Sequence, residues 1–268
     1  MTKERGSIHR YKCKTCGRTY VIDDGFYHRH KSKRLILDTL HLQPKLSYRE
    51  LADHFNISKN TPWAWVKYYT LKLMDFLKFR VPQSCDYLHM DELFLKMKNT
   101  FYYLWDSVSK DTRFTFWFLA PCRTREYAKR LMKLSPTPTE LLITDGAFSY
   151  MRPIKEYYGL RFYYSKYHRC ESFEDKKDNN LIERVQNTLR RYLHLKRGFF
   201  NLKTGNINLK FLWIYYNFVR NHSTIKCTPA EKAGVICFFG LKNEKERLMK
   251  IIELSFLIFL MKRNAVLG

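Results

Sequence analysis

Apolar and polar positions follow two different patterns along the chain, and the change falls at residues 81–84, Val-Pro-Gln-Ser. Before this point, apolar residues recur at helical spacing, which is typical of helices packed on one face. After it, continuous apolar and aromatic runs of strand length take over. The pattern therefore predicts an all-helical segment over residues 31–80, followed by a domain that contains a sheet.

The second part of the chain begins with three strand patterns and then alternates between helix and strand. The predicted elements are strands at Tyr87–Met97, Phe101–Val108 and Arg113–Leu119, a helix at Thr124–Leu134, a strand at Glu140–Thr144, a helix at Pro153–Tyr158 and a strand at Arg161–Ser165. A further helix follows at Asp178–Tyr192. This order suits an α/β fold in which a mixed sheet carries helices on its faces.

The helix predicted at Asp178–Tyr192 carries the most informative charge. Asn180 is a good N-cap, and Glu183 three residues later would complete a capping box. Glu183 and Arg190 are two turns apart and share a polar face. Beyond Glu183 the chain has no acidic residue until after Lys226, although it has many basic ones. Glu183 is therefore either a cap or a functional carboxylate.

Composition narrows the class of partner. The 268 residues include 49 Lys and Arg against 25 Asp and Glu, a net charge of +24, which favours nucleic acid first and a membrane surface second. The seven Cys are mostly scattered, which indicates a reduced, cytoplasmic protein rather than a disulfide scaffold. No signal-peptide pattern is seen, and the most apolar run, Ile251–Met261, is too short to span a bilayer.

The first thirty or so residues contain a Cys-x-x-Cys knuckle, Cys13 and Cys16, followed by Gly17. Such a turn aims two thiolates at one zinc ion, but a zinc site needs four ligands. No second Cys-x-x-Cys is present, but His28 and His30 lie downstream and His9 lies upstream, and at least one of His28 and His30 is expected to join the two Cys if zinc binds. The segment is either a zinc site or the remnant of one.

Residues 46–61 have the pattern of a helix-turn-helix. Ser47 and Glu50 form a capping box for the first helix, and Ala52 is small enough for a close helix crossing. Asn56 falls in the turn, and Ser58 is expected to cap the second helix. The side chains then offered to a DNA major groove are Lys59, Asn60, Thr61, Trp63 and Lys67. The alternative is an ordinary helical hairpin.

Three carboxylates stand where chemistry is expected. Asp91 interrupts a buried-looking strand, which is costly unless the carboxylate is paired or binds a cation, while its neighbour Glu92 points to the opposite face. Asp145 ends a strand, where α/β sheets place ligands, although Asp-Gly is also a common turn. With Glu183 they form a set of oxygen ligands that suits two divalent ions, usually Mg²⁺, acting on a phosphodiester.

The motifs together resemble those of Asp-Asp-Glu (DDE) transposases of prokaryotic insertion sequences, close to the IS6 group, over residues 85–235. The matching segments are His89-Met90-Asp91-Glu92, Ile143-Thr144-Asp145-Gly146, Asn179 to Arg184, Arg197-Gly198-Phe199, Tyr215 to His222, and Thr228 to Gly234. Arg190 matches the basic residue seven positions after the family's Glu. The Cys knuckle is similar to the second half of the zinc ribbons with which many such transposases begin.

This resemblance implies a ribonuclease H-like five-stranded sheet with Asp91 on its central strand. It implies that Asp91, Asp145 and Glu183 are catalytic and bind Mg²⁺ or Mn²⁺, and that Arg190 contacts a DNA phosphate. It also implies that the protein binds its element's terminal inverted repeats and target DNA as a homo-oligomer, because two ends must be brought together.

The sequence thus predicts four segments: a partial zinc ribbon (1–30), a helix-turn-helix domain (31–80), a DDE catalytic domain (85–235) and an extra C-terminal helix (241–268). We expect the last to be unnecessary for the chemistry. The leading hypothesis is a nucleoid-associated transposase that cleaves element ends and joins their 3′-hydroxyls to target DNA. The alternative is an inactive or domesticated, sequence-specific DNA-binding protein. The intact carboxylate set favours the enzyme.

Overall fold

The chain forms two compact units. The computed structural model describes residues 10–21, 24–26, 31–97, 100–145, 147–169, 176–197, 199, 201–238 and 240–265. One unit comprises Met1–Lys78 together with Gly240–Gly268, and the other comprises Phe79–Phe239. The extra helix predicted at residues 241–268 therefore folds with the N-terminal helices.

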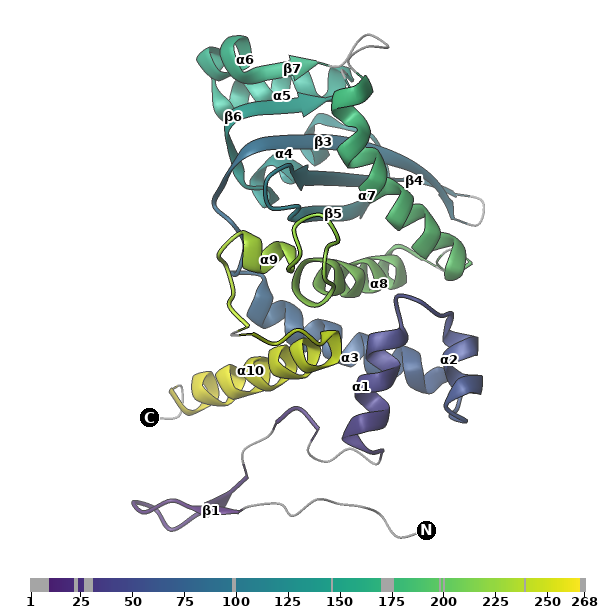
Figure 1. Cartoon of the computed structure of the whole chain (residues 1–268), viewed down its shortest axis with the longest axis vertical. Coiled ribbons are helices and arrows are strands. Elements are labelled where there is room, and N and C mark those ends of the chain that lie inside the picture. Colours follow the sequence, from purple (N-terminus) through teal and green to yellow (C-terminus); the bar gives the residue numbers. More distant parts are fainter. Residues whose placement is uncertain are drawn as a thin grey trace. The chain divides into compact units, whose positions relative to one another are not determined.

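The first unit is built from α1 (Lys33–Leu42), α2 (Tyr48–His54), α3 (Asn60–Leu77) and α10 (Glu244–Ala265). The helix α3 is central, because α1, α2 and α10 all pack against it, and α10 also contacts α1. Figure 1 shows α10, in yellow, running alongside α3. Leu248, Ile251 and Ile252 of α10 are completely buried.

Ion pairs reinforce the packing of α10 on α1. The Lys33 ammonium lies 3.0 Å from Glu253, and Lys245 lies 2.6 Å from Asp38. His41 Nε2 is 3.0 Å from the Glu244 carboxylate. Each pair joins one residue of α1 to one residue of α10, at both ends of α1. The pairs therefore fix the register of α10 on α1.

Gly25 is held against this helical unit. Its φ is +92°, and a Cβ there would lie 2.6 Å from Ile252 Cγ2, so only glycine fits without rearrangement. The Tyr69 hydroxyl donates a hydrogen bond to the Gly25 carbonyl at 2.8 Å. The segment before α1 is therefore tied to both α3 and α10.

Residues 46–61, predicted as a helix-turn-helix, show several of the local features expected from the sequence. Ser47 and Glu50 form the predicted capping box, Ala52 is buried, and Asn56 in the turn has a positive φ of 49°. The expectation that Ser58 caps the next helix is wrong. The N-cap of α3 is Lys59, in helical conformation and without a side-chain cap, and the Ser58 carbonyl accepts the Thr61 amide in a tight turn.

The Cys knuckle forms a hairpin of β1 (Tyr11–Lys12) and β2 (Thr19–Tyr20). Cys13 is half-buried and Cys16 is exposed. Within the described ranges no third His, Cys or carboxylate completes a ligand set with them. The predicted partners His28 and His30 lie outside the described residues.

The second unit contains a five-stranded sheet in the order β5-β4-β3-β6-β7. Its strands are β3 (Ser84–Met97), β4 (Thr100–Ser109), β5 (Thr115–Ala120), β6 (Thr137–Thr144) and β7 (Tyr167–Arg169). The first three are antiparallel neighbours, whereas β6 pairs parallel with β3 and β7 with β6. This is the predicted ribonuclease H-like sheet, with Asp91 on its central strand.

Helices cover both faces of this sheet. One face carries α4 (Arg125–Leu134) and α5 (Phe148–Tyr158), which share a buried core with β3, β4, β5 and β6. The opposite face carries α7 (Lys176–Leu195) against β3 and β4, and α8 (Leu202–Ile214) lies against β5. In Figure 1, α7 crosses in front of the sheet, with α4 and α5 behind it. The short helix α9 (Pro229–Lys232) follows.

The strand predicted at residues 161–165 is wrong. These residues form the helix α6 (Leu160–Lys166), and the fifth strand follows it as β7. Aromatic contact with the preceding helix holds this segment, because Tyr158, the last residue of α5, stacks on Phe162 at 4.7 Å between ring centroids. These contacts outweigh the strand propensity of the aromatic residues.

The capping interpretation of Glu183 is also wrong. The helix α7 begins at Lys176, so Asn180 lies within the helix and cannot be its N-cap. The predicted apolar face is confirmed, since Ile182, Val185 and Leu189 are buried. Glu183 itself is exposed and therefore needs another explanation.

The edge strand β5 is hydrogen-bonded by side chains as well as by β4. The Asn217 amide, in the π-helical turn η1 (Tyr215–Val219), accepts a hydrogen bond from the Thr115 amide at 3.0 Å and donates one to the Thr115 carbonyl at 3.1 Å. Asn206 of α8 accepts a hydrogen bond from the Leu119 amide at 3.3 Å. The outward amide and carbonyl of Thr115 and the outward amide of Leu119 are thus satisfied within the unit.

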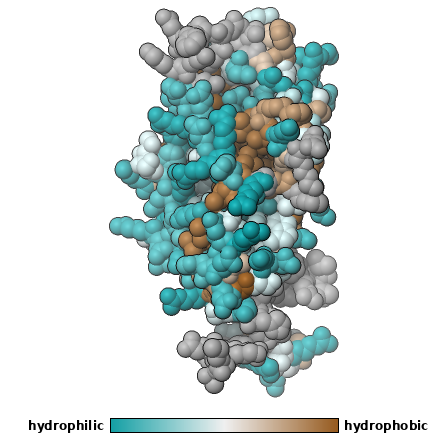
Figure 2. Space-filling view, turned by 90° about the vertical axis from the view of Figure 1, so that its right-hand side faces the viewer, coloured by the Kyte–Doolittle hydropathy of each residue, from teal (hydrophilic) through white to brown (hydrophobic). Residues whose placement is uncertain are grey.

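The end of β3 and the start of β4 extend past the point where α7 crosses the sheet in Figure 1. Phe94 and Phe101 in this extension stack at 4.8 Å between ring centroids, and each is about half exposed. Figure 2, which views the side toward which these strand ends point, shows apolar surface in its upper half among hydrophilic side chains. Of the helices in the described ranges, none is long and apolar enough to cross a membrane.

Candidate active site

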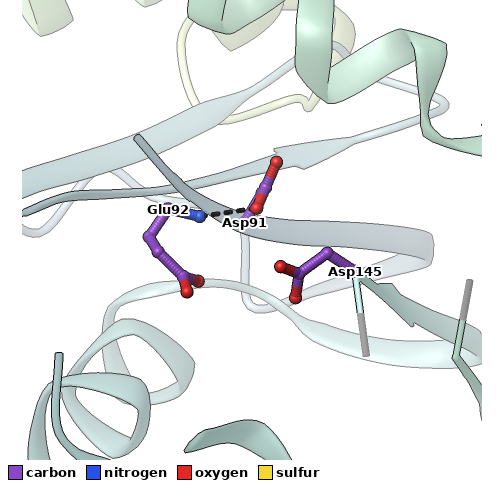
Figure 3. Close-up of side chains that lie close together, drawn as sticks. All are labelled: Asp91, Glu92 and Asp145. Carbon is purple, nitrogen blue, oxygen red and sulfur yellow. Dashed lines mark hydrogen bonds between the residues drawn. The ribbon is translucent and has the colours of Figure 1, made fainter. Parts of the chain in front are cut away.

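Asp91 and Glu92 leave β3 on opposite faces of the sheet, because side chains alternate along a strand. Asp91 points toward α7 and Glu92 toward α5, as Figure 3 shows for the two side chains. The Asp91 Oδ1 atom accepts a hydrogen bond from the Glu92 amide at 2.8 Å. This local bond restricts the rotation of the Asp91 carboxylate.

Asp145 follows directly after β6. Its neighbour Thr144 pairs with Met90 in the parallel register of β6 and β3, so Asp145 emerges beside Asp91. The Asp145 Oδ1 atom accepts a hydrogen bond from the Ala147 amide at 3.0 Å, just before α5 begins. The strand register and this turn together place the Asp145 carboxylate at the C-terminal end of β6.

Carboxylate oxygens of Asp91, Glu92 and Asp145 all lie within 4.8 Å of one another. In the part of the chain that the structure describes, this is the one such group of three or more metal-ligating side chains. The predicted pair Asp91 and Asp145 is thus brought together, and Glu183 is not a member of the group. Glu183 lies on α7, about one turn before Gln186, which contacts Asp91.

The α7 face of the site is a network of polar side chains. Gln186 is buried, and its Nε2 donates to Asp91 Oδ2 at 2.8 Å and to Asp106 Oδ1 at 3.4 Å. Asp106 lies on β4 directly opposite Asp91 and is completely buried. The exposed Arg190 donates to Gln186 Oε1 at 3.5 Å and to Asn187 at 3.1 Å.

The α5 face is organised around Glu92, whose side chain is only 4% exposed. The Tyr150 hydroxyl donates to Glu92 at 2.7 Å, and Arg123 forms an ion pair with the same carboxylate. Arg123 also reaches Asp145, at 3.4 Å. One arginine therefore links the buried carboxylate to the more exposed one.

The carboxyl groups of this site are crowded and poorly hydrated. Burial raises the pKa of Asp91 to about 7, and the negative charge of Asp145 adds to the rise. Burial also raises the pKa of Glu92, opposed by the Tyr150 hydroxyl and Arg123. The pKa of Asp106 is raised well above its usual value by burial and then by Asp91. A bound cation would offset this repulsion.

A recess of about 710 Å³ opens beside Asp145. It is lined by the starts of α4 and α5 and includes Arg123, Arg125 and Glu126. At its edge, Phe148 has 78% of its surface exposed. A large aromatic side chain and arginines next to a carboxylate cluster form a surface of the kind that binds single-stranded nucleic acid.

The predicted DNA-reading residues lie at the start of α3. Lys59, Asn60 and Lys67 are exposed, and Thr61 is half-buried. Trp63 is half-buried, with its ring edge-on to Tyr48 at 5.8 Å between centroids. The polar members of this set are thus accessible, while Trp63 also stabilises the contact of α3 with α2.

Sequence reasoning missed four residues of the site: Glu92, Arg123, Asp106 and Gln186. Asp106 carried a usable signal, because it interrupts an aromatic strand as Asp91 does. Gln186 carried a weaker one, as a polar residue beside the apolar positions of an amphipathic helix. Arg123 carried no signal in the sequence, since its ion pairs with Glu92 and Asp145 depend on how far apart the ends of β5 and β6 lie in the folded unit.

Comparison with solved structures returns retroviral integrases. The catalytic core domain of HTLV-2 integrase, in complex with magnesium, is 18% identical, with 57% of this chain and 97% of that chain covered and a TM-score of 0.42. A chain of the simian T-cell lymphotropic virus intasome, in complex with the PP2A regulatory subunit B56 gamma, is 11% identical, with 74% of each chain covered and a TM-score of 0.42.

No curated protein matches the chain. A transposase family model described as a DDE domain matches residues 86–222, just over half of the chain. The matched region contains all of the five-stranded sheet except the first two residues of β3, together with Asp91, Asp145 and the helix that carries Glu183. The chain therefore belongs to the DDE-domain family, and it is a DDE transposase.

Proposed function

We propose that this transposase cleaves the ends of its own insertion element and joins the resulting 3′-hydroxyls to target DNA. The observation that carries the proposal is the meeting of Asp91 and Asp145 at neighbouring strands of the ribonuclease H-like sheet. Glu183 is the third carboxylate in this proposal, supported by its exposed position on α7 near Gln186.

The residues fit a hard divalent cation such as Mg²⁺ or Mn²⁺. Carboxylate oxygens are the ligands that these ions prefer, and a cation would offset both causes of the raised pKa of Asp91, its burial and the nearby negative charge of Asp145. Asp91, Asp145 and Glu183 would hold the ions. When bound, such ions supply activation of the attacking oxygen and stabilisation of the leaving oxygen of a phosphodiester.

DNA would be held by basic and polar side chains of both units. Arg190 is exposed and bonded to the residue that touches Asp91, a position suited to a phosphate contact. Lys59, Asn60, Thr61, Trp63 and Lys67 would recognise the element's terminal repeats through the major groove. Because two ends must be joined together, we propose that the active form is a homo-oligomer.

A comparison of four carboxylate variants tests this proposal. Asp91→Asn, Asp145→Asn and Glu183→Gln should each lower Mg²⁺-dependent cleavage of a labelled element end by roughly a thousandfold, the equivalent of about 4 kcal/mol. Binding of the same fragment in a gel shift should remain. Glu92→Gln is the matched control, because this carboxylate is already occupied by Tyr150 and Arg123, and it should retain measurable cleavage.

The results also separate the two functions. If Glu92→Gln loses cleavage and Glu183→Gln keeps full activity, Glu92 would be the third metal-binding carboxylate and Glu183 would not. Cleavage that survives all three of the other changes would disprove the mechanism. Specific binding by a wild-type protein that never cuts, with either Mg²⁺ or Mn²⁺, would instead favour a DNA-binding regulator.

A further inference from the structure

Gln186 is the polar residue on the buried side of α7 that reaches the central strand. Only 4% of its surface is exposed, and it lies among the buried residues Ile182, Val185 and Leu189. Burying an amide costs free energy unless its donors and acceptor are satisfied. The contacts of this side chain therefore indicate why an amide, rather than an apolar side chain, occupies the position.

The Gln186 amide bridges two strands of the sheet. Its Nε2 atom donates to Asp91 Oδ2 on β3 at 2.8 Å and to Asp106 Oδ1 on β4 at 3.4 Å. Asp91 and Asp106 are direct cross-strand partners. With the Glu92 amide on Oδ1, each oxygen of the Asp91 carboxylate accepts one hydrogen bond, so its orientation is set from two directions.

The surroundings also select the orientation of the amide. Its oxygen faces the Arg190 guanidinium at 3.5 Å, and its nitrogen faces two carboxyl groups. The flipped amide would place oxygen against oxygen and nitrogen against the guanidinium. A neutral donor also leaves the negative charge of Asp91 in place, whereas Lys or Arg at this position would compete with a metal ion.

We propose that Gln186 is a positioning residue that holds the Asp91 carboxylate in the orientation needed to bind a divalent cation. The inference rests on the proposed function insofar as Asp91 is a metal ligand. Glu183 lies about one turn before Gln186 on α7. The hydrogen bond from Gln186 to Asp91 therefore couples the packing of α7 on the sheet to the position of the Asp91 carboxylate. Gln186 thereby connects two of the three carboxylates without binding the metal itself.

The test is binding of Mn²⁺ to the full-length protein without DNA, measured by isothermal titration calorimetry. Gln186→Met keeps the length and volume of the side chain but removes its donors. It should weaken Mn²⁺ binding by roughly 10- to 100-fold, the usual effect of removing a residue that orients a metal ligand. Thr188→Val is the matched control, because the Thr188 hydroxyl donates to the Arg184 carbonyl of its own helix and, among the described residues, to no carboxylate of the site. This variant should bind Mn²⁺ like the wild type.

A folded Gln186→Met protein with wild-type Mn²⁺ affinity would overturn the inference. If this variant does not fold, Gln186→Asn decides by the same criterion, since its shorter amide cannot reach Asp91. Asp91→Asn should abolish the binding, and Mn²⁺ binding that survives that change would also overturn the inference. A wild type that binds Mn²⁺ through Asp91 but never cleaves DNA would refute only the proposed function.

Discussion

The packing of α10 on the N-terminal helices predicts that the last residues of the chain control DNA binding through stability. Leu248 is completely buried in this helix, whereas Leu257 on the same helix is 39% exposed. Replacing each leucine by alanine removes the same atoms, from a buried position at Leu248 and from an exposed one at Leu257. Leu248→Ala should destabilise the helical unit by about 3–5 kcal/mol, and Leu257→Ala by about 1 kcal/mol or less.

The expected loss is large for a unit of this size. Natural domains are stable by only about 5–15 kcal/mol, and 1 kcal/mol shifts the melting temperature of a small domain by about 4–8 °C. Leu248→Ala should therefore lower the melting temperature of the helical unit by about 10 °C or more. Truncation after Gly240 removes all the buried residues of α10 and should leave this unit largely unfolded.

The assay pairs urea unfolding, followed by circular dichroism, with a gel shift on a labelled element end. Truncation should abolish specific DNA binding, while the unit that carries the five-stranded sheet stays folded. Cleavage should then be lost because the KM for DNA rises. The chemical step itself would then not need residues 241–268, whereas the expectation from sequence that truncation leaves cleavage in place would not hold. Equal costs for the two leucine variants, or unchanged DNA binding after truncation, would refute this account.

Three further predictions concern the site. Mg²⁺ should raise the melting temperature more at pH 8 than at pH 6, because the pKa of Asp91 is about 7 and its proton competes with the metal. Without metal, the raised pKa of Asp91 means that its contribution to the free energy of unfolding is lost as pH rises through about 7. An Mg²⁺ effect on the melting temperature that does not depend on pH would count against the raised pKa of Asp91 and against its role as a metal ligand. Phe148→Ala should raise the KM for DNA about tenfold with little change in kcat, whereas Phe148→Tyr should behave like the wild type in steady-state cleavage assays. Tyr150→Phe should cost about 1–3 kcal/mol in urea unfolding, because Glu92 loses a buried donor; an unchanged unfolding midpoint would show that Arg123 alone suffices.

Local patterns predicted most of the elements because helix and strand periodicities are properties of neighbouring residues. The strands around Asp91 and the amphipathic helix of Glu183 were found in this way. The fifth strand was missed because its three residues are too few to show a period, and because the aromatic residues before it have strand propensity but pack as a helix.

The site was harder to predict than the fold. The sequence could suggest Asp91 and Asp145, since each falls at a conspicuous place in a strand pattern. It could not supply the register that sets Asp106 opposite Asp91, or the helix position that brings Gln186 to both. The packing of α10 on α1 and α3 was beyond local reasoning for the same reason, because it joins segments about 200 residues apart.

The side-chain amides along β5 have a consequence for how copies of the protein can associate. An open strand edge recruits strands from other chains, and this is a common route to both dimers and aggregates. Asn217 and Asn206 already occupy the outward Thr115 and Leu119 groups, so a foreign strand would have to displace them before it could pair there. Pairing of the sheets of two copies through this part of β5 would therefore cost the side-chain hydrogen bonds of Asn217 and Asn206, which disfavours it.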